Sequence, residues 1–274
     1  MNTTTSPTDH TDSRVSVPEA SVQPANRAIF FIVVGCAVMF LILHLGLTWL
    51  DGKADATWSR IGVTAVMLTV ALIFQRLVFK VGPGKALRML GYGPVDLRAV
   101  LVAAIISVVL LSYFPIFTAL TGVSIRLNKD WLWMLLGIVA VQGFSEETLF
   151  RGYVFGNLRK LGIPFRRSGF ISMAVFALVH LVLFTQFPFI VALLSTLVAL
   201  AYAFPTAYLF ERGNRTIWAP VLLHITTSAI RLVDIPEASY MLAASVWIGI
   251  QLIIPFLVYA FLGNLLKQRT SGTD

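Results

Sequence analysis

The chain contains eight apolar stretches, most of them roughly 17 to 25 residues long, the length that a helix needs to cross a hydrocarbon layer about 30 Å thick. They are approximately Ala28–Leu50, Trp58–Phe79, Leu97–Leu120, Trp131–Leu158, Ser168–Phe184, Phe189–Phe210, Ile217–Val233 and Met241–Leu266. Apolar residues make up 57% of the chain and charged residues 12%, and this composition excludes a soluble globular domain. The sequence therefore predicts an all-α, polytopic transmembrane helix bundle with about eight spans.

The fifth and sixth stretches are almost continuous, so a turn must separate them. One helix over residues 168–210 would be about 65 Å long at about 1.5 Å per residue, twice the hydrocarbon thickness. We therefore predict that the chain turns at Thr185-Gln186-Phe187-Pro188.

The basic residues divide unequally between the two sides of the predicted bundle. With a cytoplasmic N-terminus, 15 of the 21 basic residues fall on that side, five fall on the other, and Arg151 lies in the membrane. Cytoplasmic loops carry such an excess of lysine and arginine. The distribution predicts an integral protein of the plasma (inner) membrane with both termini cytoplasmic, and it accounts for the net charge of +8 without a nucleic-acid partner.

The ends of the chain differ in composition from its middle. Residues 1–26 are rich in Ser, Thr, Pro and Asp and have no apolar periodicity, which predicts a disordered cytoplasmic tail. Residues 27–267 form the predicted membrane domain, and residues 268–274 a short cytoplasmic tail.

Three ionisable side chains interrupt the fourth apolar stretch: Glu146, Glu147 and Arg151. An acidic or basic side chain at the centre of a spanning helix is unfavourable by roughly 2.5–3.5 kcal/mol, so such groups face a protein interior or a water-filled cavity and mark function. Glu147 and Arg151 are four residues apart and are expected to form a buried ion pair. Glu146 lies about 100° further round the helix and is left free to face a different cavity.

Two histidines lie at a similar predicted depth. Counted from the nearest cytoplasmic basic residues at about 1.5 Å per residue, Glu146 and His180 lie roughly 20 Å deep and His224 roughly 14 Å. Phe176 shares a helix face with His180, and Ser228 shares one with His224, because each pair is four residues apart. Three helices thus bring a carboxylate and two imidazoles to one level of the membrane.

A carboxylate and two histidines in a wet pocket support two kinds of amide hydrolysis. In one, Glu146 takes a proton from water, and histidine or hydroxyl donors hold the oxyanion. In the other, Glu146, His180 and His224 bind one divalent metal such as zinc.

The ordered motifs resemble a known family. The residues that carry the resemblance are Glu146-Glu147-xxx-Arg151, Phe176-xxx-His180 and Trp218-Ala219-Pro220-xxx-His224. They are similar to the three motifs of the CPBP family, the CAAX proteases and bacteriocin-processing enzymes, which includes the type II CAAX prenyl protease. The resemblance covers about residues 130–228 and implies an intramembrane endopeptidase.

Carried over by position, the resemblance makes Glu146 the activator of water and Glu147 and Arg151 its support, with His180 and His224 as the second- and third-motif histidines. The family usually has Asn or Asp four residues after the last histidine, where this chain has Ser228. Serine can still donate a hydrogen bond, but its side chain is shorter.

These observations lead us to expect hydrolysis of a peptide bond near the cytoplasmic face. His180 would position or polarise the water, and His224 with Ser228 would stabilise the oxyanion. The substrate would be a protein or peptide, either lipid-modified as for CAAX proteases or a peptide precursor.

Two other classes of function use similar residues. One is a non-catalytic membrane immunity or scaffold protein whose polar cluster binds a partner. The other is an ion-coupled transporter, which also places carboxylates and histidines in the middle of the membrane. A transporter is favoured by inverted repeats or paired broken helices, and neither is clear in this sequence.

Overall fold

The computed structural model describes residues 25–50, 52 and 55–262, so that the predicted tails lie almost wholly outside the described residues. The described chain is nearly all helical, with two strands of two residues each. The elements are α1 (Ala25–Leu50), α2 (Ala56–Phe79), α3 (Pro83–Met89), α4 (Leu97–Leu111), α5 (Tyr113–Thr121), β1 (Arg126–Leu127), α6 (Trp131–Ile138), η1 (Val139–Glu146), η2 (Thr148–Phe155), α7 (Gly156–Lys160), α8 (Phe165–His180), α9 (Leu183–Gln186), α10 (Phe189–Arg212), α11 (Trp218–Thr227), η3 (Ala229–Leu232), β2 (Val233–Asp234), α12 (Glu237–Gln251) and η4 (Ile254–Phe256). The segments η1 and η2 are π-helical, and η3 and η4 are 3₁₀-helical.

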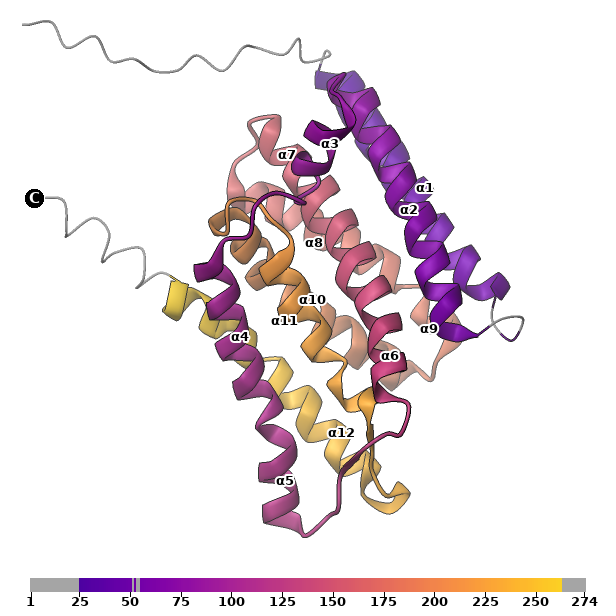
Figure 1. Cartoon of the computed structure of the whole chain (residues 1–274), viewed down its shortest axis with the longest axis vertical. Helices are drawn as coiled ribbons and strands as arrows, with labels where there is room; N and C mark the ends of the chain where they lie inside the picture. Colours follow the sequence, from indigo (N-terminus) through magenta and orange to yellow (C-terminus); the bar gives the residue numbers. More distant parts are fainter. Residues whose placement is uncertain (1–24, 51, 53–54, 263–274) are drawn as a thin grey trace, which may run out of the picture.

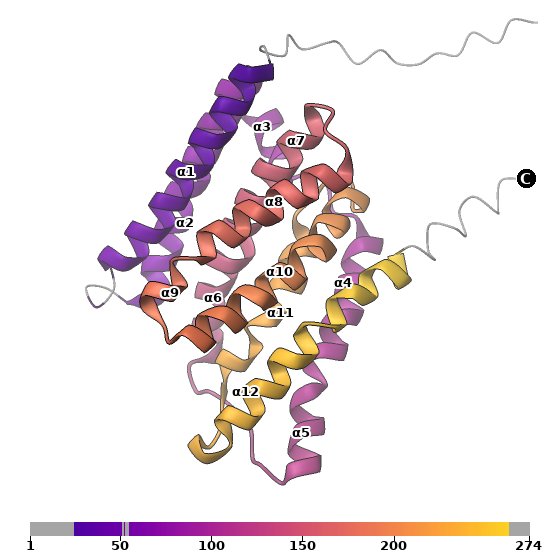
Figure 2. The ribbon, with the colours of Figure 1, turned by 180° about the vertical axis from the view of Figure 1, so that it is seen from behind.

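The helices form one bundle with a hairpin at its side. Figure 1 and Figure 2 show the α1–α2 pair on one flank and α4, α5 and α12 on the other, with the run from α6 to α7, α8, α10 and α11 between them. The start of α1 lies at the end of the bundle that carries α3 and α7, and α12 runs from the opposite end back in that direction (Figure 1). An even number of crossings would produce this arrangement.

Six helical stretches of the described chain are long and apolar enough to cross a membrane. They are Asn26–Leu50, Ala56–Phe79, Leu97–Thr121, Phe165–Gln186, Phe189–Arg212 and Glu237–Leu262. Each corresponds to a predicted span, and the polytopic helical fold is confirmed. The two remaining predicted spans correspond to the run from α6 to α7, which changes helix type, and to α11, which has only ten residues. These two segments carry most of the ionisable residues of the predicted site, namely Glu146, Glu147, Arg151 and His224.

Local signals set the helix ends. Asp55 caps α2 by accepting hydrogen bonds from the backbone N–H groups of Thr57 and Trp58, and Asp96 caps α4 in the same way. The predicted turn between the fifth and sixth spans lies at Phe187, whose backbone is extended, and at Pro188, the N-cap residue that precedes α10.

Polar pairs attach the central helix run to α2. The Ser145 hydroxyl donates to Thr64 at 2.8 Å, and the side-chain amides of Gln75 and Asn157 exchange two hydrogen bonds of 3.0 and 2.9 Å. In an apolar environment such bonds and small residues hold helices together. At the other end of the bundle, β1 pairs antiparallel with β2 and joins the two loops beside α6 and α12.

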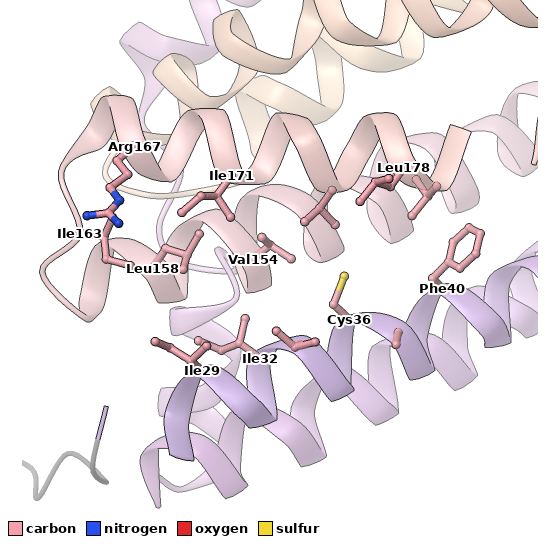
Figure 3. Close-up of a pocket in the computed structure, with 14 residues that line it drawn as sticks. Ile29, Ile32, Cys36, Phe40, Val154, Leu158, Ile163, Arg167, Ile171 and Leu178 are labelled. Carbon is pink, nitrogen blue, oxygen red and sulfur yellow. The ribbon is translucent and has the colours of Figure 1, made fainter. Parts of the chain in front are cut away.

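An apolar groove of about 630 Å³ runs between α1 and α8 (Figure 3). Val154 and Leu158 contribute to its wall, and the one charged side chain that lines it is Arg167 at one end. None of the residues of the predicted polar site lines this groove. The chemistry of the chain must therefore be sought elsewhere in the bundle.

Candidate active site

The acidic pair lies where two π-helical segments meet. Glu146 is the last residue of η1, and Glu147 lies between η1 and η2. A regular helix was expected over Trp131–Leu158, but the hydrogen bonds here run from residue i to i+5. Such segments are frequent at functional sites, because the wider turn redirects the side chains that it carries.

Glu147 and Arg151 form the buried ion pair expected from their spacing. Nη1 of Arg151 lies 3.2 Å from Oε1 of Glu147, and their side chains are 2% and 0% exposed. Nη2 of Arg151 donates to the Thr206 hydroxyl on α10, and the guanidinium carbon lies 5.1 Å from the centre of the Phe176 ring on α8. A buried charge is stable only with such partners. Through its contacts, the Arg151 guanidinium connects η2 with α8 and α10.

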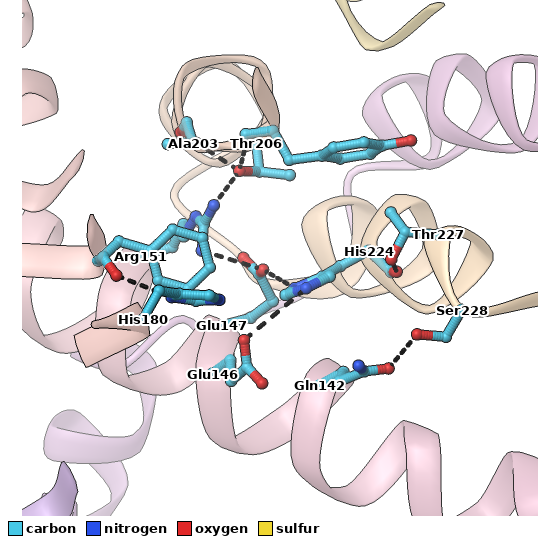
Figure 4. Close-up of polar contacts among 12 residues, drawn as sticks. Gln142, Glu146, Glu147, Arg151, His180, Ala203, Thr206, His224, Thr227 and Ser228 are labelled. Carbon is cyan, nitrogen blue, oxygen red and sulfur yellow. Dashed lines mark hydrogen bonds and ion pairs between the residues drawn. The ribbon is translucent and has the colours of Figure 1, made fainter. Parts of the chain in front are cut away.

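His224 lies between the two neighbouring carboxylates (Figure 4). Its Nδ1 lies 2.6 Å from Oε1 of Glu147, and its Nε2 lies 3.8 Å from Oε2 of Glu146. An ionised carboxylate only accepts hydrogen bonds, so Nδ1 carries the proton and Nε2 faces Glu146. The sequence analysis placed the two carboxylates in different cavities, whereas in the structure they contact opposite nitrogens of one imidazole.

Glu146 and Glu147 differ in their access to solvent. The Glu146 side chain is 21% exposed, and that of Glu147 is fully buried. Glu147 is also held by Arg151 and His224, whereas the nearest ionisable partner of Glu146 among the described residues is His224 at the longer distance of 3.8 Å. A water molecule or a substrate would therefore meet Glu146 and not Glu147.

A glycine allows α11 to approach the acidic helix closely. A Cβ atom added to Gly143 would lie 3.1 Å from side-chain carbons of both Val221 and Ile225. Small residues at crossing points permit such close packing of helices in membranes. Val221 and Ile225 flank His224 along α11, so this contact helps to bring the imidazole to the carboxylates.

Ser228 reaches the acidic helix through a residue that the sequence analysis did not select. Its hydroxyl donates to Oε1 of Gln142, which lies on η1 four residues before Glu146 (Figure 4). A sequence signal for Gln142 did exist, since it is an uncharged polar residue one turn before Glu146 in an apolar run.

His180 and Phe176 reach the site from α8. Nδ1 of His180 lies 2.8 Å from the backbone carbonyl oxygen of Phe176, which only accepts, so Nδ1 donates and the lone pair of a neutral ring lies on Nε2. The two rings meet edge to face with their centres 4.5 Å apart. Within the described chain, His180 makes no hydrogen bond or ion pair with Glu146, Glu147 or His224, and its link to them runs through Phe176 and Arg151.

The alternative metal site does not fit this arrangement. In the part of the chain that the structure describes, no three His, Cys, Asp or Glu side chains are grouped closely enough to hold a metal ion. Glu146 and His224 are close to each other, but His180 contacts neither. The set of Glu146, His180 and His224 therefore does not form the three-ligand group expected of a hydrolytic zinc centre.

The loop after α3 packs directly against the site helices. The Tyr92 hydroxyl lies 2.7 Å from that of Thr148, and Nε1 of Trp218 donates to the Gly93 carbonyl at 2.9 Å. Burial raises the pKa of Tyr92 to about 12, so this phenol stays protonated at neutral pH. This loop therefore contacts both η2, which carries Thr148, and α11, which begins at Trp218.

Comparisons with known proteins agree with the motifs. No curated protein and no solved structure matches the chain. A family model described as type II CAAX prenyl endopeptidase Rce1-like matches residues 128–230, a segment that contains every site residue predicted from the sequence. Together with the six helices that are long and apolar enough to cross a membrane, this match supports an integral membrane protein. Over residues 128–230, the chain is similar to the Rce1-like family of type II CAAX prenyl endopeptidases.

Proposed function

We propose that this protein is an intramembrane endopeptidase in which Glu146 activates the water that attacks a peptide bond. The observation that carries the proposal is the placement of a partly exposed Glu146 carboxylate 3.8 Å from Nε2 of His224, an imidazole anchored by the buried Glu147–Arg151 pair. A base that is open to water beside an oriented imidazole is the arrangement that hydrolysis of an amide requires.

The proposed reaction has two steps. Glu146 takes a proton from a water molecule while the water oxygen bonds to the carbonyl carbon, and the carbonyl oxygen becomes an oxyanion. The C–N bond then breaks as protonated Glu146 gives its proton to the departing nitrogen. Glu146 is ionised again once it has given its proton to the nitrogen, and the new carboxyl group then loses its own proton to solvent, so the products are a carboxylate and an amine.

The two histidines have different proposed roles. His224 donates to the oxyanion from Nε2 when it is doubly protonated, and the buried Glu147 carboxylate beside Nδ1 stabilises the charge of the imidazolium. His180 uses the Nε2 lone pair to orient water, because its Nδ1 proton is held by the Phe176 carbonyl. We derive no step through a metal ion.

The proposed substrate is a protein or peptide cut near the cytoplasmic face, with residues 130–228 as the catalytic core and both termini in the cytoplasm. The family match supports a protein or peptide substrate. The two candidate substrates are a lipid-modified CAAX-type protein and an unmodified peptide precursor. Faster cleavage of a lipid-modified peptide than of the same peptide without lipid would favour the first.

Cleavage of a peptide library by the purified protein tests the proposal. The library contains prenylated and unmodified peptides, and Glu146→Gln is compared with wild type. Glu237→Gln, at an exposed glutamate that begins α12, serves as the matched control. We expect cleavage by wild type and Glu237→Gln, and none by Glu146→Gln.

Two outcomes would overturn parts of this proposal. Equal cleavage by wild type and Glu146→Gln would remove Glu146 as the base. Loss of cleavage with a chelator and recovery with zinc would replace the water mechanism by a metal-dependent one. If a cellular phenotype of the protein survives Glu146→Gln unchanged, the non-catalytic scaffold is the better account.

A further inference from the structure

We propose that the side-chain amide of Gln142 donates a hydrogen bond to the oxyanion, and that Ser228 acts on the reaction only by positioning Gln142. This inference rests on the proposed endopeptidase function and adds a catalytic residue to it. It also changes the role that the sequence analysis expected for Ser228.

The first argument is the number of protons available. A serine hydroxyl has one proton to donate. In the structure that proton is donated to Oε1 of Gln142, so the hydroxyl cannot donate to an oxyanion at the same time. The Ser228 side chain is also buried, at 5% exposure. Ser228 is therefore placed to hold another side chain rather than to contact the substrate.

The second argument is the state of the Gln142 amide. Its oxygen accepts from Ser228, which assigns the other end of the amide to the NH₂ group with its two donor protons. Among the described residues, no hydrogen bond occupies this nitrogen, and the side chain is half-buried. An oriented and unoccupied donor in a sheltered place is what stabilisation of an oxyanion needs.

The third argument is position. Gln142 and Glu146 are both on η1, one helical turn apart, and Figure 4 shows Gln142 lying between Glu146 and Ser228. On the facing helix, His224 and Ser228 are also one turn apart. Polar contacts thus join the acidic segment to α11 at two places: His224 lies beside Glu146 and Glu147, and Ser228 donates to Gln142.

The close helix crossing keeps these two contacts in register. Gly143 lies next to Gln142 and meets Val221 and Ile225, the residues on either side of His224. Because that crossing is tight, α11 has little freedom to slide along η1. The Gln142 amide is therefore held at a set place relative to the Glu146 carboxylate, and preorganised donors of this kind stabilise transition states most effectively.

The principal test replaces Gln142 by methionine, which has a similar length and no donor. We expect kcat to fall about 10²- to 10³-fold, the usual effect of removing one oxyanion donor, with KM little changed. Gln186→Met, at an exposed glutamine at the end of α9, is the matched control and should keep the wild-type kcat. Thermal unfolding of each variant in detergent establishes that it is folded.

A double-mutant cycle separates the roles of the two residues. If Ser228 acts through Gln142, Ser228→Ala lowers kcat in the wild-type background and has little further effect in Gln142→Met. If Ser228 itself donates to the oxyanion, its loss lowers kcat by the same factor in both backgrounds. The second result, or a wild-type kcat in Gln142→Met, would overturn the inference.

Failure of the inference can be told apart from failure of the proposed function, because Glu146→Gln is measured in the same assay. An inactive Glu146→Gln beside a fully active Gln142→Met refutes only the role of Gln142. A Glu146→Gln variant that cleaves like wild type refutes the endopeptidase mechanism itself, and the role of Gln142 is refuted with it.

Discussion

Nδ1 of His224 lies 2.6 Å from Oε1 of Glu147, and the same carboxylate oxygen lies 3.2 Å from the guanidinium of Arg151. One buried oxygen therefore serves both an imidazole on α11 and a cation on η2. Since Glu147 is completely buried, it is not placed to react with a substrate, but it orients the imidazole that faces Glu146. We therefore expect Glu147 to contribute both to the stability of the fold and to activity. A single and a double substitution distinguish these two contributions.

Glu147→Gln should reduce both properties, because it leaves the buried Arg151 charge without its partner. Removal of one member of a buried pair typically destabilises a protein by about 3–5 kcal/mol. The double variant Glu147→Gln/Arg151→Met should recover much of that stability and stay much less active than wild type, because a neutral amide oxygen can still accept from Nδ1 of His224 but no longer stabilises a doubly protonated imidazole. Thermal unfolding and peptide cleavage measure the two effects. A double variant that regains activity would contradict the anchoring role of Glu147.

Thr206→Val should destabilise the protein by about 1–3 kcal/mol, since Nη2 of Arg151 would lose the hydroxyl that accepts from it. Thr196→Val is the matched control on the same helix, because the Thr196 hydroxyl donates to the Ala192 carbonyl one turn earlier and, within the described chain, bonds to no charged side chain. The two variants are compared by denaturation in one detergent. Equal losses of stability would show that the contact between Thr206 and Arg151 contributes nothing specific.

Gly152→Ala should be strongly unfavourable. A Cβ atom at this position would lie 2.2 Å from the backbone oxygen of Leu90, so the loop after α3 would have to move. Such overpacking typically reduces stability by about 1–3 kcal/mol. The displacement should also weaken the bond between Tyr92 and Thr148 beside the site and lower the rate of cleavage.

The control for this substitution is Gly249→Ala on α12, where the added Cβ meets no atom within 4 Å. Because alanine favours a helix more than glycine does, that variant should be neutral or slightly stabilising. A Gly152→Ala variant as stable and as active as Gly249→Ala would show that the loop adapts freely.

Lys160 should make stability depend on pH. Burial, and secondly the charge of Arg215, lower the pKa of this lysine from 10.5 to about 7 in the folded protein. Between pH 7 and 10.5 the unfolded chain therefore binds a proton that the folded protein lacks, so stability rises with pH across this window. Below about pH 7 Lys160 is protonated in both states, and the buried charge then destabilises the folded protein to its full extent.

The measurement is the unfolding midpoint from pH 6 to 10 for wild type, Lys160→Met and the exposed control Lys85→Met. The difference between wild type and Lys160→Met should change with pH, in favour of wild type as pH rises. A constant difference would mean that Lys160 keeps its ordinary pKa in the folded protein.

Several features of this protein follow from local sequence. Apolar runs of spanning length predict the helices, and Pro188 with its neighbours predicts the turn between α8 and α10. The spacing of four between Glu147 and Arg151 predicts their ion pair. These features are predictable because neighbours on one helix are set by backbone geometry alone, whatever the rest of the chain does.

The tertiary structure decided the contacts that make the site. His224 and Glu147 are 77 residues apart in sequence, and Ser228 and Gln142 are 86 apart. Their meeting depends on the π-helical turns that redirect the carboxylates and on Gly143, which lets α11 approach. Sequence alone therefore predicted the residue types of the candidate site. Packing between distant helices determined which atoms face one another, because that packing depends on the shapes of side chains from several helices at once.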